Sequence, residues 1–265
     1  MIPKKQPVLQ LLIAIVFIAV AMTVGTIVNQ PGLKRYFPYF PAILLLLTTW
    51  WLYRREGKSM KTIGLTISGR NFKLLLVGFL IGAVAFLIAR ILRTIYSGEA
   101  LVFATSINYN SILSSMYYLL PMVLVEELLF RGYLFKKTLE IWNITTANIL
   151  FSVLFTLIHI MDEQVLSRPP ILIMLLVSIP IGHLLFATAL LRSGSLLLPV
   201  GLHLGNNWAT RHLVSSVDDG NSILFIPESA TFDTWPSFIG LILIYNCVFA
   251  LVLFFMLKWK GYSAR

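Results

Sequence analysis

The sequence predicts an all-α, polytopic membrane protein with about eight transmembrane helices in one bundle. Hydrophobic residues make up 58% of the 265 positions, charged residues only 12%, and long apolar runs recur along the whole chain. A soluble domain carries about 25% charged residues, and no soluble fold of this size needs so much apolar surface. We therefore expect one integral membrane domain over residues 1–265.

Eight apolar runs approach the length of about 20 residues that a membrane-spanning helix needs. They lie at 8–28, 38–53, 72–96, 112–135, 145–161, 170–190, 195–213 and 236–257. The turn sequences NQPG, SRPP and RSGS separate several of them. No small-residue cleavage site follows the first run, so we expect it to stay as a helix rather than act as a signal peptide.

The basic residues are distributed unevenly between the two ends of these runs. With the N-terminus in the cytoplasm, 14 of the 21 Lys and Arg fall on the cytoplasmic side: Lys4, Lys5, Arg54, Arg55, Lys58, Lys61, Arg70, Lys73, Lys136, Lys137, Arg192, Lys258, Lys260 and Arg265. The loop at 214–235 holds four acidic residues, Asp218, Asp219, Glu228 and Asp233, and no basic one. The positive-inside rule then predicts eight spans with both termini cytoplasmic.

The net charge of +10 and the single cysteine exclude several classes of function. Positive charge at the ends of spans meets anionic lipid, and no basic, aromatic-rich soluble face indicates a nucleic-acid partner. Cys247 stands alone, so neither a disulfide within the chain nor a cysteine-ligated metal site is possible.

Polar residues inside the apolar runs point to a site, because an ionisable group within a span costs several kcal/mol. They are Glu126, Glu127, Arg131, His159, His183, His203, Asn206, Asn207, Arg211 and His212. At about 1.5 Å per residue, Glu126, His159 and His203 all lie about 15–18 Å from the cytoplasmic side. Three helices thus place an acid or an imidazole at one depth, which predicts one shared buried site.

The spacing of these residues predicts which of them share a helix face. Glu127 and Arg131 are four residues apart and can pair, which leaves Glu126, about 100° away, to point elsewhere. His203 and Asn207 have the same spacing and can face one cavity. The remaining polar residues have structural explanations: His183 as a hydrogen-bonded core residue, Asn206 facing another helix, and Arg211 and His212 as interface anchors.

Two chemical schemes fit this set of side chains. A glutamate in a water-poor pocket can act as general base on a water molecule, while His and Asn donors stabilise the oxyanion of an attacked amide. Alternatively, Glu126, His159 and His203 can bind Zn²⁺, which would itself activate the water. Both schemes give hydrolysis of a peptide bond at membrane depth, and the spacing favours neither.

Three short motifs in order resemble one known family. EELLFR at 126–131 is similar to the EExxxR motif of the CPBP intramembrane proteases, a family that includes the type II CAAX prenyl endopeptidases and Abi-type bacteriocin-immunity proteins. FTLIH at 155–159 resembles the FxxxH motif of that family, and HLGNN at 203–207 resembles its HxxxN motif. The resemblance implies an eight-helix bundle with an internal catalytic cavity, with a protease core at about residues 112–213.

Residue by residue, the resemblance implies that Glu126 activates water and that His159 positions it or ligates a metal. It implies that His203 and Asn207 form the oxyanion hole, with Glu127 and Arg131 in support. Ser193 stands where the family commonly has Thr, and His183 interrupts a run of small residues; both departures concern packing. The expected partners are the bilayer and a membrane-associated protein or peptide, in the plasma (inner) membrane of a bacterium.

Two other functions remain open on the sequence. One is a non-proteolytic scaffold or bacteriocin-immunity factor of the same fold, which would not need Glu126. The other is a small-molecule or proton transporter that uses the same buried acids; Pro121, Pro180 and Pro199 are breaks of the kind such proteins use, but no inverted repeat is visible. The sequence does not indicate the substrate, the metal content or the oligomeric state.

Overall fold

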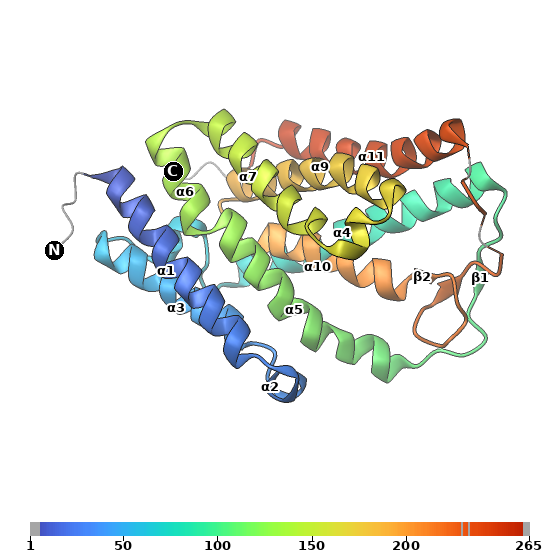
Figure 1. Cartoon of the computed structure of the whole chain (residues 1–265), viewed down its shortest axis with the longest axis horizontal. Coiled ribbons are helices and arrows are strands. Elements are labelled where there is room, and N and C mark those ends of the chain that lie inside the picture. The colour runs from blue at the N-terminus through green and yellow to red at the C-terminus, as the bar shows by residue number, and fades with distance from the viewer. Residues whose placement is uncertain (1–5, 229, 233, 262–265) are drawn as a thin grey trace.

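The fold is an elongated bundle of α-helices with a very small sheet at one end (Figure 1). The computed structural model describes residues 6–228, 230–232 and 234–261. Its helices are α1 (Pro7–Val28), α2 (Pro31–Tyr36), α3 (Phe40–Arg55), the 3-10 helix η1 (Met60–Ile63), α4 (Gly69–Ser97), α5 (Tyr109–Arg131), α6 (Tyr133–Ile141), α7 (Ile144–Ile160), α8 (Glu163–Leu166), α9 (Pro169–Ser193), α10 (Leu197–His212) and α11 (Trp235–Lys258).

Each of the eight predicted apolar runs forms a helix, and the fourth divides into α5 and α6. Five helical segments are long and apolar enough to cross a membrane: α1, α4, the α5–α6 segment, α9 and α11. The helix α7 is apolar but has 17 residues, and α3 and α10 have 16 each. The chain is thus an all-α integral membrane protein, while the count of eight spans stays a prediction.

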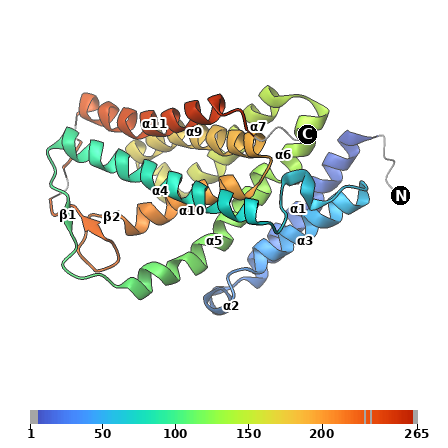
Figure 2. The same cartoon turned by 180° about the vertical axis from the view of Figure 1, so that it is seen from behind.

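The start of α1 and the end of α11 lie at one end of the bundle, and the strands lie at the other (Figures 1 and 2). The strands are β1 (Val102–Phe103), β2 (Val214–Ser215) and β3 (Leu224–Phe225). β3 is central, antiparallel to β1 and parallel to β2. The orientation of the chain in a membrane stays a prediction. Lys4, Lys5, Asp233 and Arg265, which the charge asymmetry also used, lie outside the described residues.

Two glycine pairs bring α4 and α10 into direct backbone contact, which we call the glycine seam. Its members are Gly78, Gly82, Gly201 and Gly205. A Cβ atom added at Gly82 would lie 2.1 Å from the carbonyl oxygen of Leu202, and one at Gly205 would lie 2.0 Å from that of Phe79. Small residues four apart allow such approach between helices in a membrane. The seam fixes the position of His203, which lies between its two glycines on α10.

A break at Gly132 separates α5 from α6. A Cβ atom at Gly132 would lie 2.1 Å from the carbonyl oxygen of Leu128, so any larger residue would disturb the turn. The break leaves Glu126, Glu127 and Arg131 on the last two turns of α5. The sequence predicts one continuous helix here, and the structure corrects it to two.

Candidate active site

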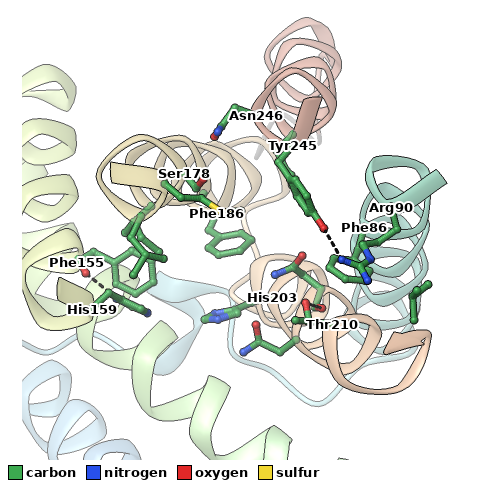
Figure 3. Close-up of a pocket in the computed structure, with 18 of the residues that line it drawn as sticks. Phe86, Arg90, Phe155, His159, Ser178, Phe186, His203, Thr210, Tyr245 and Asn246 are labelled. Atoms are coloured by element: carbon green, nitrogen blue, oxygen red, sulfur yellow. Dashed lines mark hydrogen bonds between the residues drawn. The ribbon is translucent and has the colours of Figure 1, made fainter. Parts of the chain in front are cut away.

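A cavity of about 660 Å³ opens between α4, α7, α9, α10 and α11. His159 from α7 and His203 from α10 line it, together with the amides Asn206 and Asn207 (Figure 3). Aromatic rings from three helices, Phe86, Phe155 and Phe186, form much of its apolar wall. Glu126 is not among the lining residues, but it reaches the two lining imidazoles from α5.

The innermost part of the site is a buried ion-pair network. The Oε1 atom of Glu127 lies 3.3 Å from Nη1 of Arg131 and 2.8 Å from Nδ1 of His203. Both the Glu127 and Arg131 side chains are fully buried. The Arg131 guanidinium also lies 4.3 Å from the ring centre of Phe155 and 5.1 Å from that of Phe186, which places it between two π faces. This network holds the imidazole of His203 in one orientation.

The outer part of the site is less enclosed. The Oε2 atom of Glu126 lies 3.6 Å from Nε2 of His203 and 3.9 Å from Nε2 of His159. That oxygen is buried and has no hydrogen-bond partner among the described residues. The side chains of Glu126 and His159 are 20% and 28% exposed, against 0% for Glu127. An unpartnered carboxylate oxygen therefore faces two imidazole nitrogens at the open side of the network.

The hydrogen bonds of the two imidazoles fix which nitrogen faces Glu126. Nδ1 of His159 lies 2.7 Å from the carbonyl oxygen of Phe155, which can only accept, so this nitrogen donates. Nδ1 of His203 donates in the same way to Glu127. Each imidazole thus presents Nε2 to Glu126. The ring of Phe186 stacks on that of His203 at 4.9 Å, which further restricts its orientation.

The three charged side chains of this cluster carry a net formal charge of −1. Glu126 and Glu127 contribute two negative charges and Arg131 one positive charge, so a single proton on an imidazole would neutralise the cluster. His203 lies between both carboxylates, at 3.6 Å from one and 2.8 Å from the other.

Part of the chain resembles a known protein family. Residues 108–209 match the family described as type II CAAX prenyl endopeptidase Rce1-like. The matched segment is less than half of the 265-residue chain. No curated protein and no solved structure matches it.

The matched segment covers the CAAX-protease residues that the sequence motifs indicated. It begins at the N-cap of α5 and ends within α10, so it contains Glu126, Glu127, Arg131, His159, His203 and Asn207. The structure places the first five in one connected cluster and Asn207 on the wall of the adjoining cavity. The helices α4 and α11, which form the opposite wall of the cavity, lie outside the matched segment.

A zinc ion held by Glu126, His159 and His203 is the alternative that the sequence leaves open. The donor types fit, since each Nε2 is free and each Nδ1 is held by an acceptor, as metal-ligating histidines usually are. Donors that share a tetrahedral zinc lie about 3.3–3.4 Å apart, whereas these are 3.6 and 3.9 Å apart. Among the described residues, no group of three or more His, Cys, Asp or Glu side chains is arranged to hold a metal ion. The donor types therefore fit zinc, and the donors lie farther apart than those around a bound ion.

Three polar residues differ from the expectations drawn from the sequence. Asn206 lines the cavity instead of facing another helix. His183 is buried, but neither ring nitrogen has a hydrogen-bond partner in the described part of the chain. His212 is also buried, and its Nδ1 donates to the carbonyl oxygen of Asn221, so it holds the β2–β3 loop and is not an interface anchor.

Sequence reasoning missed the polar residues on the far wall of the cavity. Arg90 from α4, Thr210 from α10 and Tyr245 from α11 line it. The sequence could have indicated Arg90, because it is a charged residue within an apolar helix that extends seven residues beyond it. Its position toward the cavity depends on the packing of α4 against α10 and α11, which the sequence pattern does not give.

Proposed function

We propose that the chain is an intramembrane endopeptidase that hydrolyses a peptide bond in a membrane-associated protein or peptide, with Glu126 as the general base. One observation carries the proposal: a buried carboxylate oxygen of Glu126, which has no hydrogen-bond partner in the described part of the chain, faces the Nε2 atoms of two histidines from two other helices. The match to CAAX-type proteases supports the same reaction class.

The first step of the proposed reaction is attack by water. Oε2 of Glu126 lies beyond direct hydrogen-bond distance of both Nε2 atoms, at 3.6 and 3.9 Å, so we propose that a water molecule bound beside these three groups contacts them. Glu126 takes one proton from this water, and the oxygen of the water forms a bond to the carbonyl carbon of the peptide. His159, held by Phe155, orients the water through Nε2. Such general base catalysis contributes typically about 10²–10⁴ in rate.

The second step is collapse of the tetrahedral intermediate. Protonated His203 donates from Nε2 to the developing oxyanion, and the amide of Asn207, one turn further along α10, donates from the cavity wall. The C–N bond then breaks, and Glu126 returns its proton to the leaving amine. Glu127 and Arg131 are positioning residues: Glu127 holds Nδ1 of His203, and Arg131 compensates the charge of Glu127.

Zinc is the other route to the same hydrolysis. Glu126, His159 and His203 would hold the ion, which would supply Lewis-acid activation of water. Metal analysis of the purified protein, with activity measured after chelation and after zinc is restored, distinguishes the two routes. If the purified protein holds a stoichiometric metal that is lost in His159→Ala or His203→Ala, the zinc route replaces the metal-free mechanism.

The deciding experiment measures cleavage of membrane-associated peptides, with and without a prenyl group, by wild type and Glu126→Gln. We expect Glu126→Gln to lose at least about 10²-fold in rate while its melting temperature stays unchanged. Glu163→Gln is the matched control, because Glu163 is exposed on α8 and away from the network. Full activity of Glu126→Gln would reject the protease assignment and favour a scaffold or immunity factor.

A further inference from the structure

Within residues 6–228, 230–232 and 234–261, Arg90 is a cation in the cavity wall without an anionic partner. Its only hydrogen bond among the described residues runs from Nη1 to the hydroxyl of Tyr245, at 3.3 Å (Figure 3). Its Nε is buried and has no partner in that part of the chain. None of the ion pairs found in the described part of the chain includes Arg90. A charged side chain within an apolar helix usually pairs with another charge or serves a function.

The neighbouring arginine shows that the fold can supply a counter-ion at this depth. Arg93 lies one turn further along α4, and its guanidinium binds both carboxylate oxygens of Glu99, at 2.8 and 3.1 Å. Arg131 is likewise paired with Glu127. Arg90 differs from both because it faces an open cavity. Its free donors are therefore available to a molecule that enters the cavity.

The wall around Arg90 is polar enough to receive an anion. Thr210, Ser215 and Ser216 line the same cavity toward the sheet end of the bundle. A guanidinium has five N–H donors in a planar fork, and this fork matches carboxylate and phosphate oxygens. One of the five is used by Tyr245. The remaining donors can bind one anionic group with two hydrogen bonds.

The glycine seam gives the separation between Arg90 and the catalytic cluster. Gly78 faces the Leu198–Leu202 turn and Gly82 faces the Leu202–Asn206 turn, so α4 and α10 run parallel. Continued for eight residues, this register puts Arg90 level with about His212, nine residues past His203. At ~1.5 Å per residue that is about 14 Å along the bundle. An extended peptide covers this in about four residues, at ~3.3–3.6 Å each.

We propose that Arg90 is a specificity-determining residue that binds an anionic group of the substrate about four residues from the scissile bond. The anion is a carboxylate, either an acidic side chain or a terminal carboxylate of the peptide. The inference rests on the proposed endopeptidase function. Arg90 and Tyr245 both lie outside the segment that matches the family.

A cleavage-site profile tests the preference directly. Wild type, Arg90→Gln, Arg90→Glu and Tyr245→Phe are incubated with a mixed library of hydrophobic peptides, and the products are sequenced by mass spectrometry. We expect wild type to favour Asp, Glu or a free C-terminus three to five residues from the cut by about tenfold. Arg90→Gln should lose the preference, and Arg90→Glu should favour Lys and Arg there.

Tyr245→Phe is the matched control for a purely structural role. It removes the hydrogen bond between α4 and α11 and leaves the guanidinium in place. We expect its cleavage-site profile to match that of wild type. Loss of the preference in Tyr245→Phe as well as in Arg90→Gln would show that the link between the helices matters and the charge does not. Equal profiles for wild type and Arg90→Gln would also overturn the proposal.

A binding measurement separates this inference from the proposed reaction. In a Glu126→Gln background, a labelled four-residue hydrophobic peptide is titrated as its free acid and as its amide. We expect the acid to bind about tenfold more tightly than the amide, and we expect Arg90→Gln to abolish only that difference. This result would support the anion site even where no cleavage is detected. Cleavage together with equal binding of the acid and the amide would support the proposed endopeptidase function and reject the anion site.

An anionic lipid is the competing source of the same chemistry. Repeating the titration with phosphatidylglycerol or phosphatidylcholine in the micelles distinguishes the two. An acid-over-amide preference that persists in both lipids supports the substrate assignment. Its disappearance in phosphatidylglycerol, with Arg90-dependent binding of that lipid, would assign the site to a headgroup phosphate and overturn the proposal.

Discussion

Two clusters in this protein both pair glutamates with basic side chains, but they differ in how completely their polar atoms are hydrogen-bonded. In the α3–α6 cluster, formed by Glu56, Lys58, Lys137 and Glu140, the Nζ atom of Lys137 contacts Gln10 at 3.0 Å, Glu56 at 2.8 Å and Glu140 at 2.9 Å. In the active-site cluster, by contrast, Oε2 of Glu126, Oε2 of Glu127 and two Arg131 nitrogens have no hydrogen-bond partner among the described residues.

The contrast suggests how a structural cluster can be told from a reactive one. Lys137 uses all three of its donors, on Gln10 of α1, on Glu56 at the end of α3 and on Glu140 of its own helix, as a residue that only stabilises the fold should. Buried polar atoms without partners are costly and need an explanation. In the active-site cluster the explanation we propose is that water and substrate complete the network during the reaction.

The largest expected effect comes from removing Arg131. Arg131→Met leaves Glu127 buried with an uncompensated charge, and breaking one partner of such a pair costs about 3–5 kcal/mol. Unfolding in detergent micelles measures the loss. The double variant Glu127→Gln/Arg131→Met removes both charges and should recover much of the stability. If the double variant is as unstable as the single one, packing of Arg131 between Phe155 and Phe186 explains the loss instead.

Removing the amide of Asn207 should affect the rate and not the fold. Asn207→Ala is expected to lower kcat by about 10²–10³, the usual cost of one oxyanion donor, with an unchanged melting temperature. Asn206→Ala is the matched control, because its amide also lines the cavity but is not four residues from His203. Equal losses in the two variants would mean that neither amide has a specific role.

Glu56→Gln should affect the fold and not the rate. Hydrogen bonds to charged groups contribute about 1.5–3 kcal/mol, and Glu56 accepts them from Lys137 and Tyr133. Burial of Glu56 opposes its ionisation, but hydrogen bonds from Lys137, Tyr133 and Lys58 outweigh burial and lower its pKa from 4.5. We expect kcat at pH 7 to equal that of wild type.

The pH dependence of that variant provides a second check. A carboxyl group whose pKa is lower in the folded than in the unfolded state stabilises the fold fully at pH values above the unfolded-state pKa. This stabilisation is lost as the pH falls through the folded-state pKa. The difference in melting temperature between wild type and Glu56→Gln should therefore be constant from pH 7 to pH 5 and shrink below pH of about 4.5. A difference that persists at pH 3 would contradict this account.

The smallest effect is expected for Lys58→Met. Its side chain is 35% exposed and bridges Glu56 and Glu140 at the surface. Exposed ion pairs contribute about 0–1 kcal/mol and are screened by salt. We expect a loss within that range that vanishes at 1 M NaCl. A loss as large as that of Arg131→Met would show that the α3–α6 cluster is as tightly coupled as the active site.

The sequence was sufficient for features that depend on periodicity along one helix. Eight apolar runs predicted the main helices, and the i, i+4 spacing predicted the pair of Glu127 with Arg131. The common depth of Glu126, His159 and His203 predicted that they meet, and their side chains do lie within 4 Å in two of the three pairings. Their catalytic roles stay a prediction.

Features that depend on packing between distant segments could not be predicted. The bond between Glu127 and His203 needs α5 and α10 side by side, and no local pattern specifies that contact. The cavity position of Arg90 depends in the same way on α4, α10 and α11. The break at Gly132 and the strands β1–β3 were missed because a single glycine and two-residue strands give too weak a pattern.

The glycine seam between α4 and α10 also determines where the sequence of this protein can vary. His203 lies between two positions at which a single added methyl group would collide with the backbone of α4. Substitution at these two glycines is therefore disfavoured, whereas Asn206 and Thr210, which line the cavity, are free of this restriction. Those same residues contact what enters it, so natural variants of this helix should differ in what they accept while the distance from His203 to Glu126 stays the same.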